Sequence, residues 1–318
     1  LDPQYFEAWV NRSVPLNALK RYQEACTSCE KAIALRPNDA QGWFNHGNSL
    51  HLAREDALAI ASYDEALKLA PQNDQVWLNK GVALYGLKRY EEALTHYDTA
   101  LKLNPNAEAW SNKGNALHAL KRYPEALRCY EQAIALQPTY AQGHFNLGVF
   151  FSDLRQYEKS LLAYERAIEI DPMYAQAWAN AGDVLQELKR YPEANEYYDR
   201  AIELNAELEW IDGSRISVRT KTCDWSDIDQ DLEKIVAGIE RQKKVAQPFL
   251  VLALTDVPAL HQLAAQTYAQ EKFPANLSLG PIPKRAPASK IRIGYFSADL
   301  NNHAVAILTA QLFETHRR

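Results

Sequence analysis

Six asparagines recur along the first two thirds of the chain at intervals of 33 or 34 residues. They are Asn11, Asn45, Asn79, Asn112, Asn146 and Asn180. A carboxamide donates through its nitrogen and accepts through its oxygen, so one asparagine can hold both the N–H and the C=O of a peptide bond. A regular row of such groups suits an extended polypeptide whatever its side chains are. The sequence therefore predicts sequence-tolerant peptide capture.

The same row has a second interpretation, which the sequence leaves open. Polar side chains on packed helix faces often bond to nearby backbone groups, and the asparagines would then fix how neighbouring repeats stack. The residues three positions further on mix amides, aliphatics and one acid: Asn48, Val82, Asn115, Val149 and Asp183. They form no basic stripe that could clamp a terminal carboxylate. This favours contact along the length of a bound chain.

Two cysteines, Cys26 and Cys29, have the C-x-x-C spacing of a redox or metal-binding pair. Neither a second ligand pair nor a βαβ pattern accompanies them, and Cys29 stands where later repeats carry a tyrosine. We predict that both pack as small buried hydrophobes. Four cysteines in 318 residues are too few for a disulfide framework, which favours a reducing, cytoplasmic compartment.

The asparagines belong to a longer repeating pattern. Its anchors are Trp9, Trp43, Trp77, Trp110, His144 and Trp178. Glycine follows four residues later, at Gly47, Gly81, Gly114, Gly148 and Gly182, with Ser13 in the first unit. Small residues then precede aromatics by four, as in Ala59/Tyr63, Ala93/Tyr97, Ala126/Tyr130, Ser160/Tyr164 and Ala194/Tyr198. A period of 34 residues with these features is typical of helix–turn–helix repeats.

This pattern resembles the tetratricopeptide-repeat family over residues 1–206, in six consecutive units. The resemblance implies an all-α, right-handed superhelix (an α-solenoid) in which the first helix of each pair lines the concave surface. It places the six asparagines in a ladder along that surface, with extended polypeptides or protein substrates as partners. Self-association through the repeats stays open.

The rest of the chain differs in character. Residues 207–277 read as a helical segment, with helices around Trp210–Ile216, Trp225–Ile239 and Pro258–Tyr268. Residues 278–289 are rich in proline and small residues and read as a linker. Residues 290–318 alternate and then change to helical periodicity, which predicts a β-strand plus a helix that begin a truncated α/β, Rossmann-like lobe.

A second resemblance lies in these C-terminal segments. KIRIGYFSADLNNHAVAILTAQLFE is similar to the opening strand, loop and helix of the catalytic region of the O-GlcNAc transferase family, and TKTCDWSDID and PFLVLALTDVPALHQLAAQTYAQ are similar to its segment before that region. The resemblance implies a protein O-glycosyltransferase that transfers sugar with inversion to serine or threonine. It implies His303 as a catalytic residue, with Asp299 and Asn302 supporting the loop and helix cap. Leu300 departs from the phenylalanine of many members.

The resemblance covers only the start of a catalytic core, so the fragment alone is expected to be inactive and to need no cofactor. The parent would use a nucleotide-sugar donor, UDP-GlcNAc first among the candidates. The alternative is a non-catalytic tetratricopeptide adaptor for protein complexes. A net charge of -5 gives no reason to expect nucleic acid or an anionic membrane as a partner, and the sequence shows no metal-ligand cluster.

Overall fold

The described residues fold into α-helices only. The computed structural model describes residues 5–205 and 207–273, and this part contains sixteen helices and no strand. The first helices of six successive pairs are α1 (Phe6–Ala18), α3 (Ala40–Leu52), α5 (Asp74–Gly86), α7 (Ala107–Ala119), α9 (Ala141–Asp153) and α11 (Ala175–Glu187). The second helices are α2 (Tyr22–Leu35), α4 (Asp56–Leu69), α6 (Tyr90–Leu103), α8 (Tyr123–Leu136), α10 (Tyr157–Ile170) and α12 (Tyr191–Leu204). The predicted all-α repeat array is confirmed for these residues.

Several first helices begin at a polar cap that follows a proline in the sequence. The Asp39 carboxylate accepts from the backbone N–H of Gln41 at 2.9 Å, before α3. Asn106 accepts from the N–H of Ala109 at 2.8 Å, before α7. Because the first N–H groups of a helix have no partner within it, these side chains satisfy them and fix where each helix starts.

The two helices of each pair are joined by the same tight turn. In every pair one residue after the first helix has left-handed backbone, with φ between 56° and 67°: Lys20, Arg54, Lys88, Lys121, Arg155 and Lys189. The next N–H bonds back to the carbonyl five residues earlier, as from Arg89 to Leu84 at 2.9 Å. This is the Schellman ending of a helix. It reverses the chain in few residues, so the second helix returns along the first.

A buried tyrosine from the second helix fills the space above a glycine in the first. Tyr63, Tyr97, Tyr130, Tyr164 and Tyr198 are each at most 1% exposed. A Cβ added to Gly81 would lie 2.5 Å from Cε1 of Tyr97, and the other four glycines of this position meet their tyrosines at 2.5–2.7 Å. The close helix approach predicted at these glycines is therefore confirmed.

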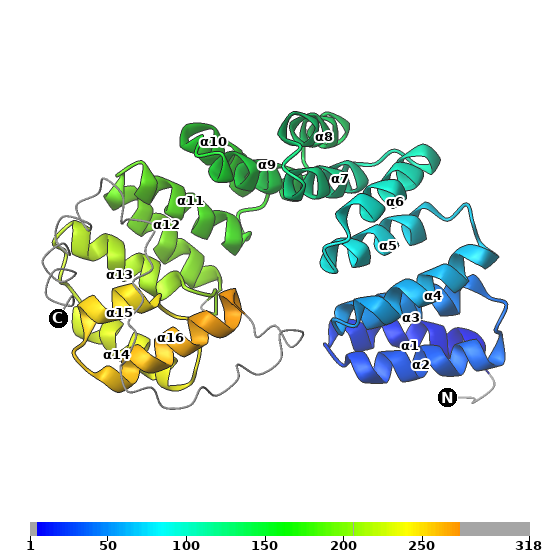
Figure 1. Cartoon of the computed structure of the whole chain (residues 1–318), viewed down its shortest axis with the longest axis horizontal. Coiled ribbons are helices and arrows are strands. Elements are labelled where there is room, and N and C mark those ends of the chain that lie inside the picture. The colour runs from blue at the N-terminus through cyan, green and yellow to red at the C-terminus, as the bar shows by residue number, and fades with distance from the viewer. Residues whose placement is uncertain (1–4, 206, 274–318) are drawn as a thin grey trace, which may run out of the picture. The chain divides into compact units, whose positions relative to one another are not determined.

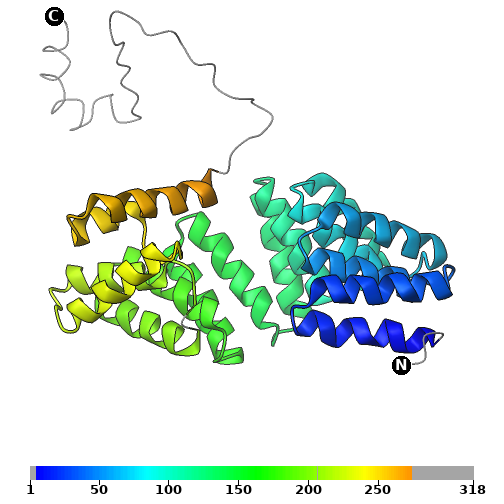
Figure 2. The same ribbon diagram turned by 90° about the horizontal axis from the view of Figure 1, so that it is seen from below.

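Successive pairs stack in chain order, as Figure 1 shows and Figure 2 repeats from below. Each second helix packs on the next first helix, and each first helix also contacts the next first helix. The first helices therefore form a continuous layer. Four anchor residues, Trp43, Trp77, His144 and Trp178, bond to the loop that enters their own helix from the preceding repeat: Trp77 Nε1 donates to the Pro71 carbonyl at 2.8 Å, and His144 Nε2 lies 3.0 Å from the Pro138 carbonyl. His144 thus keeps the anchor's hydrogen bond.

Four further helices follow the six pairs: α13 (Ile211–Lys221), α14 (Ile228–Glu240), α15 (Pro248–Leu254) and α16 (Pro258–Lys272). The sequence predicted three of them and missed α15. The 34-residue period ends near residue 206, but α13 still packs on α12 and α11 as a seventh first helix would. Arg215 of α13 pairs with Asp199 of α12 at 2.9 Å, which repeats the pairing of Lys80 with Asp64 at 2.6 Å.

The described helices belong to one compact unit that ends at Lys272. Between Phe6 and Lys272 no helix has both the length and the hydrophobicity that a bilayer crossing requires. The predicted linker at 278–289 and the predicted strand and helix at 290–318, with Asp299, Asn302 and His303, lie outside the described residues.

Candidate functional site

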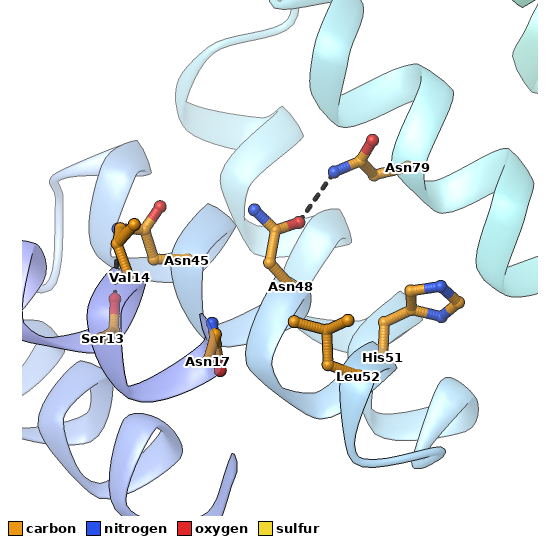
Figure 3. A pocket seen from close by; sticks show the side chains of 8 residues that line it. All are labelled: Ser13, Val14, Asn17, Asn45, Asn48, His51, Leu52 and Asn79. Atoms are coloured by element: carbon orange, nitrogen blue, oxygen red, sulfur yellow. Dashed lines mark hydrogen bonds between the residues drawn. The ribbon is translucent and has the colours of Figure 1, made fainter. Parts of the chain in front are cut away.

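A cavity of about 310 Å³ opens on the layer of first helices near the N-terminal end of the array. Its lining comes only from α1, α3 and α5: Ser13, Val14, Asn17, Asn45, Asn48, His51, Leu52 and Asn79. Figure 3 shows these side chains, with Asn48 and Asn79 turned toward each other across two repeats. Five of the eight carry an amide or a hydroxyl, and none is an acid, a lysine or an arginine. The cavity is therefore nearly uncharged: most of its accessible wall is apolar, and amides and hydroxyls are its main polar groups.

Two of the six ladder asparagines are structural. Asn45 and Asn146 are each 8% exposed. The Asn146 amide donates to the Ser111 hydroxyl of the preceding first helix at 2.9 Å, and Asn45 points in the same way toward the Val10 carbonyl and the Ser13 hydroxyl, both at 3.4 Å. For these two residues the contacts support the stacking interpretation, because both amides are used between repeats.

The other four ladder asparagines are more accessible. Asn79 and Asn180 are half-buried, and each donates once, to Asn48 at 2.8 Å and to the Tyr164 hydroxyl at 3.4 Å. Asn11 is exposed and Asn112 half-buried, and neither side chain bonds to another described residue. The six asparagines therefore differ in how far their amides are already bonded, and those of repeats one and four bond to no described residue.

A glutamine one turn earlier explains part of this difference. Gln41, Gln75 and Gln142 each donate to the oxygen of the ladder asparagine four residues on, at 2.7–2.9 Å. In the fourth repeat this position holds Glu108, which cannot donate when ionised. The Asn112 oxygen consequently receives no such bond, and the Asn112 nitrogen also bonds to no described residue, so both are available to a ligand.

A second row of polar groups lies beside the ladder. The Tyr63 hydroxyl donates to Asn48, and the Tyr130 hydroxyl donates to Asn115, each at 2.8 Å. Burial raises the pKa of both tyrosines, so the hydroxyls stay protonated and remain donors. The sequence showed these positions only as a mixed set. Their pairing with a buried tyrosine on the second helix could have been sought from the repeat spacing.

The sixth repeat carries the acid Asp183 at this position. Tyr198 donates to it at 2.7 Å. The surrounding protein reduces its hydration and raises its pKa, while hydrogen bonds from the hydroxyls of Tyr198 and Ser214 act in the opposite direction. More than a third of the residue's surface is still accessible, so the loss of hydration comes from the enclosing walls and not from complete burial.

A larger cavity, of about 890 Å³, is lined by residues of the fifth and sixth repeats, of α13 and α16, and of the loops beside them. Asn180 and Asp183 are part of its wall, together with Asp153, Glu187 and Trp210. Its wall is mostly polar and carries several charged side chains, which distinguishes it from the nearly uncharged cavity at α1, α3 and α5. The surface of the first helices therefore changes character along the array.

The cysteine pair takes no part in either cavity. Cys26 and Cys29 are buried and unpaired, at 4% and 0% exposure, and burial raises the pKa of Cys26 to about 11. Such a thiol stays protonated near neutral pH and is a poor nucleophile and metal ligand. The predicted core packing is confirmed. In residues 5–205 and 207–273, no three His, Cys, Asp or Glu side chains are grouped to hold a metal ion.

Sequence profiles of the tetratricopeptide-repeat family match much of the chain. They cover residues 18–74, 75–106, 107–140, 129–161, 151–189 and 175–208, and so run without a gap from 18 to 208. No curated protein matches the chain.

Several solved structures are similar to the described fold. PilF of Pseudomonas aeruginosa is 18% identical, with 68% of this chain and 97% of that one covered at a TM-score of 0.54. A chain of the APC/C hetero-tetramer Cut9–Hcn1 is 14% identical, covering 83% and 53% at a TM-score of 0.57. YrrB, described as a TPR protein with an unusual peptide-binding site, is 26% identical, covering 56% and 93% at a TM-score of 0.40.

Proposed function

Because the chain belongs to the tetratricopeptide-repeat family, we propose that its layer of first helices is a surface that captures extended polypeptides. The observation that carries this proposal is the cavity lined only by α1, α3 and α5, in which five of eight side chains are amides or hydroxyls. In this role the protein acts as an adaptor that holds a partner chain.

The chemistry of the lining supports recognition of the backbone more than of side chains. Amides can bond to any peptide group, and a lining without acids, lysines or arginines gives no reason to select a charged guest. Val14 and Leu52 can cover apolar parts of a side chain. The free amides of Asn11 and Asn112 extend such contacts beyond the cavity.

The ladder is tested by removing two half-buried amides: that of Asn112, which bonds to no described residue, and that of Asn79, which bonds to the side chains of Gln75 and Asn48. We expect Asn79→Ala combined with Asn112→Ala to weaken binding of uncharged peptides about tenfold or more, since each lost hydrogen bond contributes about 1 kcal/mol. Labelled peptides of about 15 residues, roughly 50 Å long when extended, can be titrated by fluorescence anisotropy. Asn146 is left intact, because replacing it breaks its bond to Ser111 and would confuse binding with stability.

The matched control is Gln132→Ala, which removes an exposed amide from α8, a second helix. It should bind as the unaltered protein does. If the double variant binds all peptides as tightly as the control does, while the unaltered protein does bind them, the ladder is not the contact surface.

A second candidate function rests on the sequence of residues 290–318. We propose that the parent protein is an O-GlcNAc-transferase-like enzyme, for which the repeats hold protein substrates. The supporting observation is the ordered similarity of KIRIGYFSADLNNHAVAILTAQLFE to the start of that family's catalytic region. His303 would then take part in the transfer, with Asp299 and Asn302 ordering its loop.

The transferase candidate is tested with a polypeptide extended past Arg318, incubated with UDP-GlcNAc and acceptor proteins. We expect sugar to appear on serine or threonine by mass spectrometry, and His303→Ala to abolish it. Absence of transfer with every UDP- and GDP-sugar would leave the adaptor function alone. Peptide binding by the repeats is measured separately, so either result can stand without the other.

A further inference from the structure

Asn48 has its oxygen completely committed within the fold. That oxygen accepts from the Tyr63 hydroxyl and from the Asn79 amide, both at 2.8 Å. A carbonyl oxygen has two lone pairs, so both are occupied. The Asn48 nitrogen bonds to no other described residue, and it lies on the side opposite to Asn79 in Figure 3. Two N–H donors are thus left over in a residue that lines the cavity.

The orientation of this amide follows from a chain of bonds. Gln75 donates to the Asn79 oxygen at 2.8 Å, so Asn79 must present its nitrogen to Asn48. Asn48 therefore presents its oxygen to the Asn79 nitrogen. The Tyr63 hydroxyl reinforces the same arrangement from the buried side. Rotating the Asn48 amide by 180° would set donor against donor and leave Tyr63 without its acceptor.

Asn115 repeats this arrangement two repeats later. It stands at the same position of α7, is half-buried, and accepts from the Tyr130 hydroxyl at 2.8 Å. Its nitrogen also bonds to no described residue. In the third and fifth repeats the position is aliphatic, with Val82 and Val149. Oriented amide donors therefore occur in repeats two and four, while the sixth repeat carries the acid Asp183 at this position.

We propose that Asn48 and Asn115 are a second set of peptide contacts, in which each amide nitrogen donates to a carbonyl oxygen of the bound chain. The buried tyrosines are positioning residues that hold these donors outward. This inference rests on the proposed polypeptide-binding function and makes it more specific. The groove has a fixed hydrogen-bond polarity at these two positions, and the guest groups that meet them are acceptors.

The test replaces each amide by the acid of the same shape. Asn48→Asp keeps an oxygen for Tyr63 and Asn79 but turns the donating nitrogen into an acceptor. We expect about tenfold weaker binding of an uncharged labelled peptide for Asn48→Asp and for Asn115→Asp, because an unmatched pair of acceptors replaces a hydrogen bond. The melting temperature should stay close to that of the unaltered protein. Gln132→Glu adds the same charge on the exposed face of α8 and should leave binding unchanged.

Tyr63→Phe separates orientation from direct contact. It removes only the hydroxyl, so a smaller loss of about threefold is expected, since Asn79 still holds the Asn48 oxygen. If the unaltered protein binds peptide and both acid variants bind within twofold of it, the inference is wrong although the proposed function stands. If the unaltered protein binds no uncharged peptide, the proposed function itself fails. A destabilised Asn48→Asp would be replaced by Asn115→Asp, which lacks the link to Asn79.

Discussion

Serine in place of Gly81 is expected to lower the free energy of unfolding by about 2–3 kcal/mol. Helix propensity alone predicts the opposite sign, since serine is about 0.5 kcal/mol better than glycine in a helix. A Cβ at this position would lie 2.5 Å from Cε1 and 2.8 Å from Cδ1 of Tyr97. The ring is 1% exposed and cannot move aside without disturbing its neighbours. Steric overlap therefore outweighs propensity.

The first repeat shows how the chain itself avoids this clash. Ser13 stands there instead of glycine, its hydroxyl bonds to the Val10 carbonyl at 2.7 Å, and Cys29 replaces the tyrosine. Cys29 is fully buried, next to Ser13 and Ser49. In the first repeat, therefore, the first helix carries a larger residue than glycine, and the second helix carries a smaller residue than tyrosine.

A double-mutant cycle measures the coupling between these two positions. Tyr97→Cys alone should cost about 3–5 kcal/mol because it leaves a cavity. Adding Gly81→Ser to Tyr97→Cys should then cost almost nothing, so the coupling free energy is about 2 kcal/mol. Urea titrations followed by circular dichroism give the free energies of unfolding. Ala61→Ser, on the exposed face of α4, is the control for serine in a helix.

Equal costs of Gly81→Ser in the otherwise unaltered protein and in the Tyr97→Cys variant would contradict the steric explanation. So would a cost no larger than that of Ala61→Ser. Either result would mean that the tyrosine ring has more freedom than its burial indicates.

The repeat pattern predicted most of the helix positions because its signals are local. Proline and a capping Asp39 or Asn106 mark where first helices begin, and glycine with tyrosine marks where the helices meet. The turns within each pair carried no such signal. Their left-handed residues include Lys20, Lys88 and Arg155, where glycine or asparagine would be expected. These turns are recognised only in the structure, from the backbone hydrogen bonds that close them.

The candidate site was harder to predict, because the role of an asparagine depends on its neighbours in space. Asn112 and Asn146 have the same place in the repeat, yet only Asn146 has a serine within reach on the preceding helix. Asn48 was not predicted as a binding residue. Its importance lies in two bonds, from α4 and α5, that fix the direction of its amide. The spacing in the sequence predicts that the asparagines form a row, and the packing of neighbouring helices determines which of their amides stay unbonded.

The 34-residue period also did not predict that the stack continues through α13 and α14. This continuation depends on ion pairs, and the sequence alone does not show which charged residues lie next to each other. Asp231, at 5% exposure, lies between two guanidinium groups, those of Arg215 and of Arg219, and the Arg219 Nη1 is 2.8 Å from its Oδ2. Arg219 is itself 8% exposed and also bonds to Asp224 at 3.0 Å. This buried network joins the last repeats to the helices that follow.

Asp231→Asn is expected to cost about 3–5 kcal/mol, because it leaves two guanidinium groups facing a neutral amide in a buried site. The amide would also turn an N–H₂ toward one of them. The loss should concentrate in α13 and α14, since each unit of a repeat array contacts mainly its neighbours. Hydrogen exchange resolved by residue should therefore show faster exchange in these helices, with little change in α1 to α6.

The same change at Asp227 is the matched control for this prediction. The Asp227 carboxylate lies 3.9 Å from the Arg219 guanidinium but its side chain is 73% exposed. Exposed ion pairs contribute about 0–1 kcal/mol, because water screens them and solvates the freed partner. Asp227→Asn should then leave exchange in α14 almost unchanged. An effect of Asp231→Asn as small as that of Asp227→Asn would contradict the prediction, and would show that packing among Ile216, Ile235 and Ile239 holds α13 to α14 without the buried network.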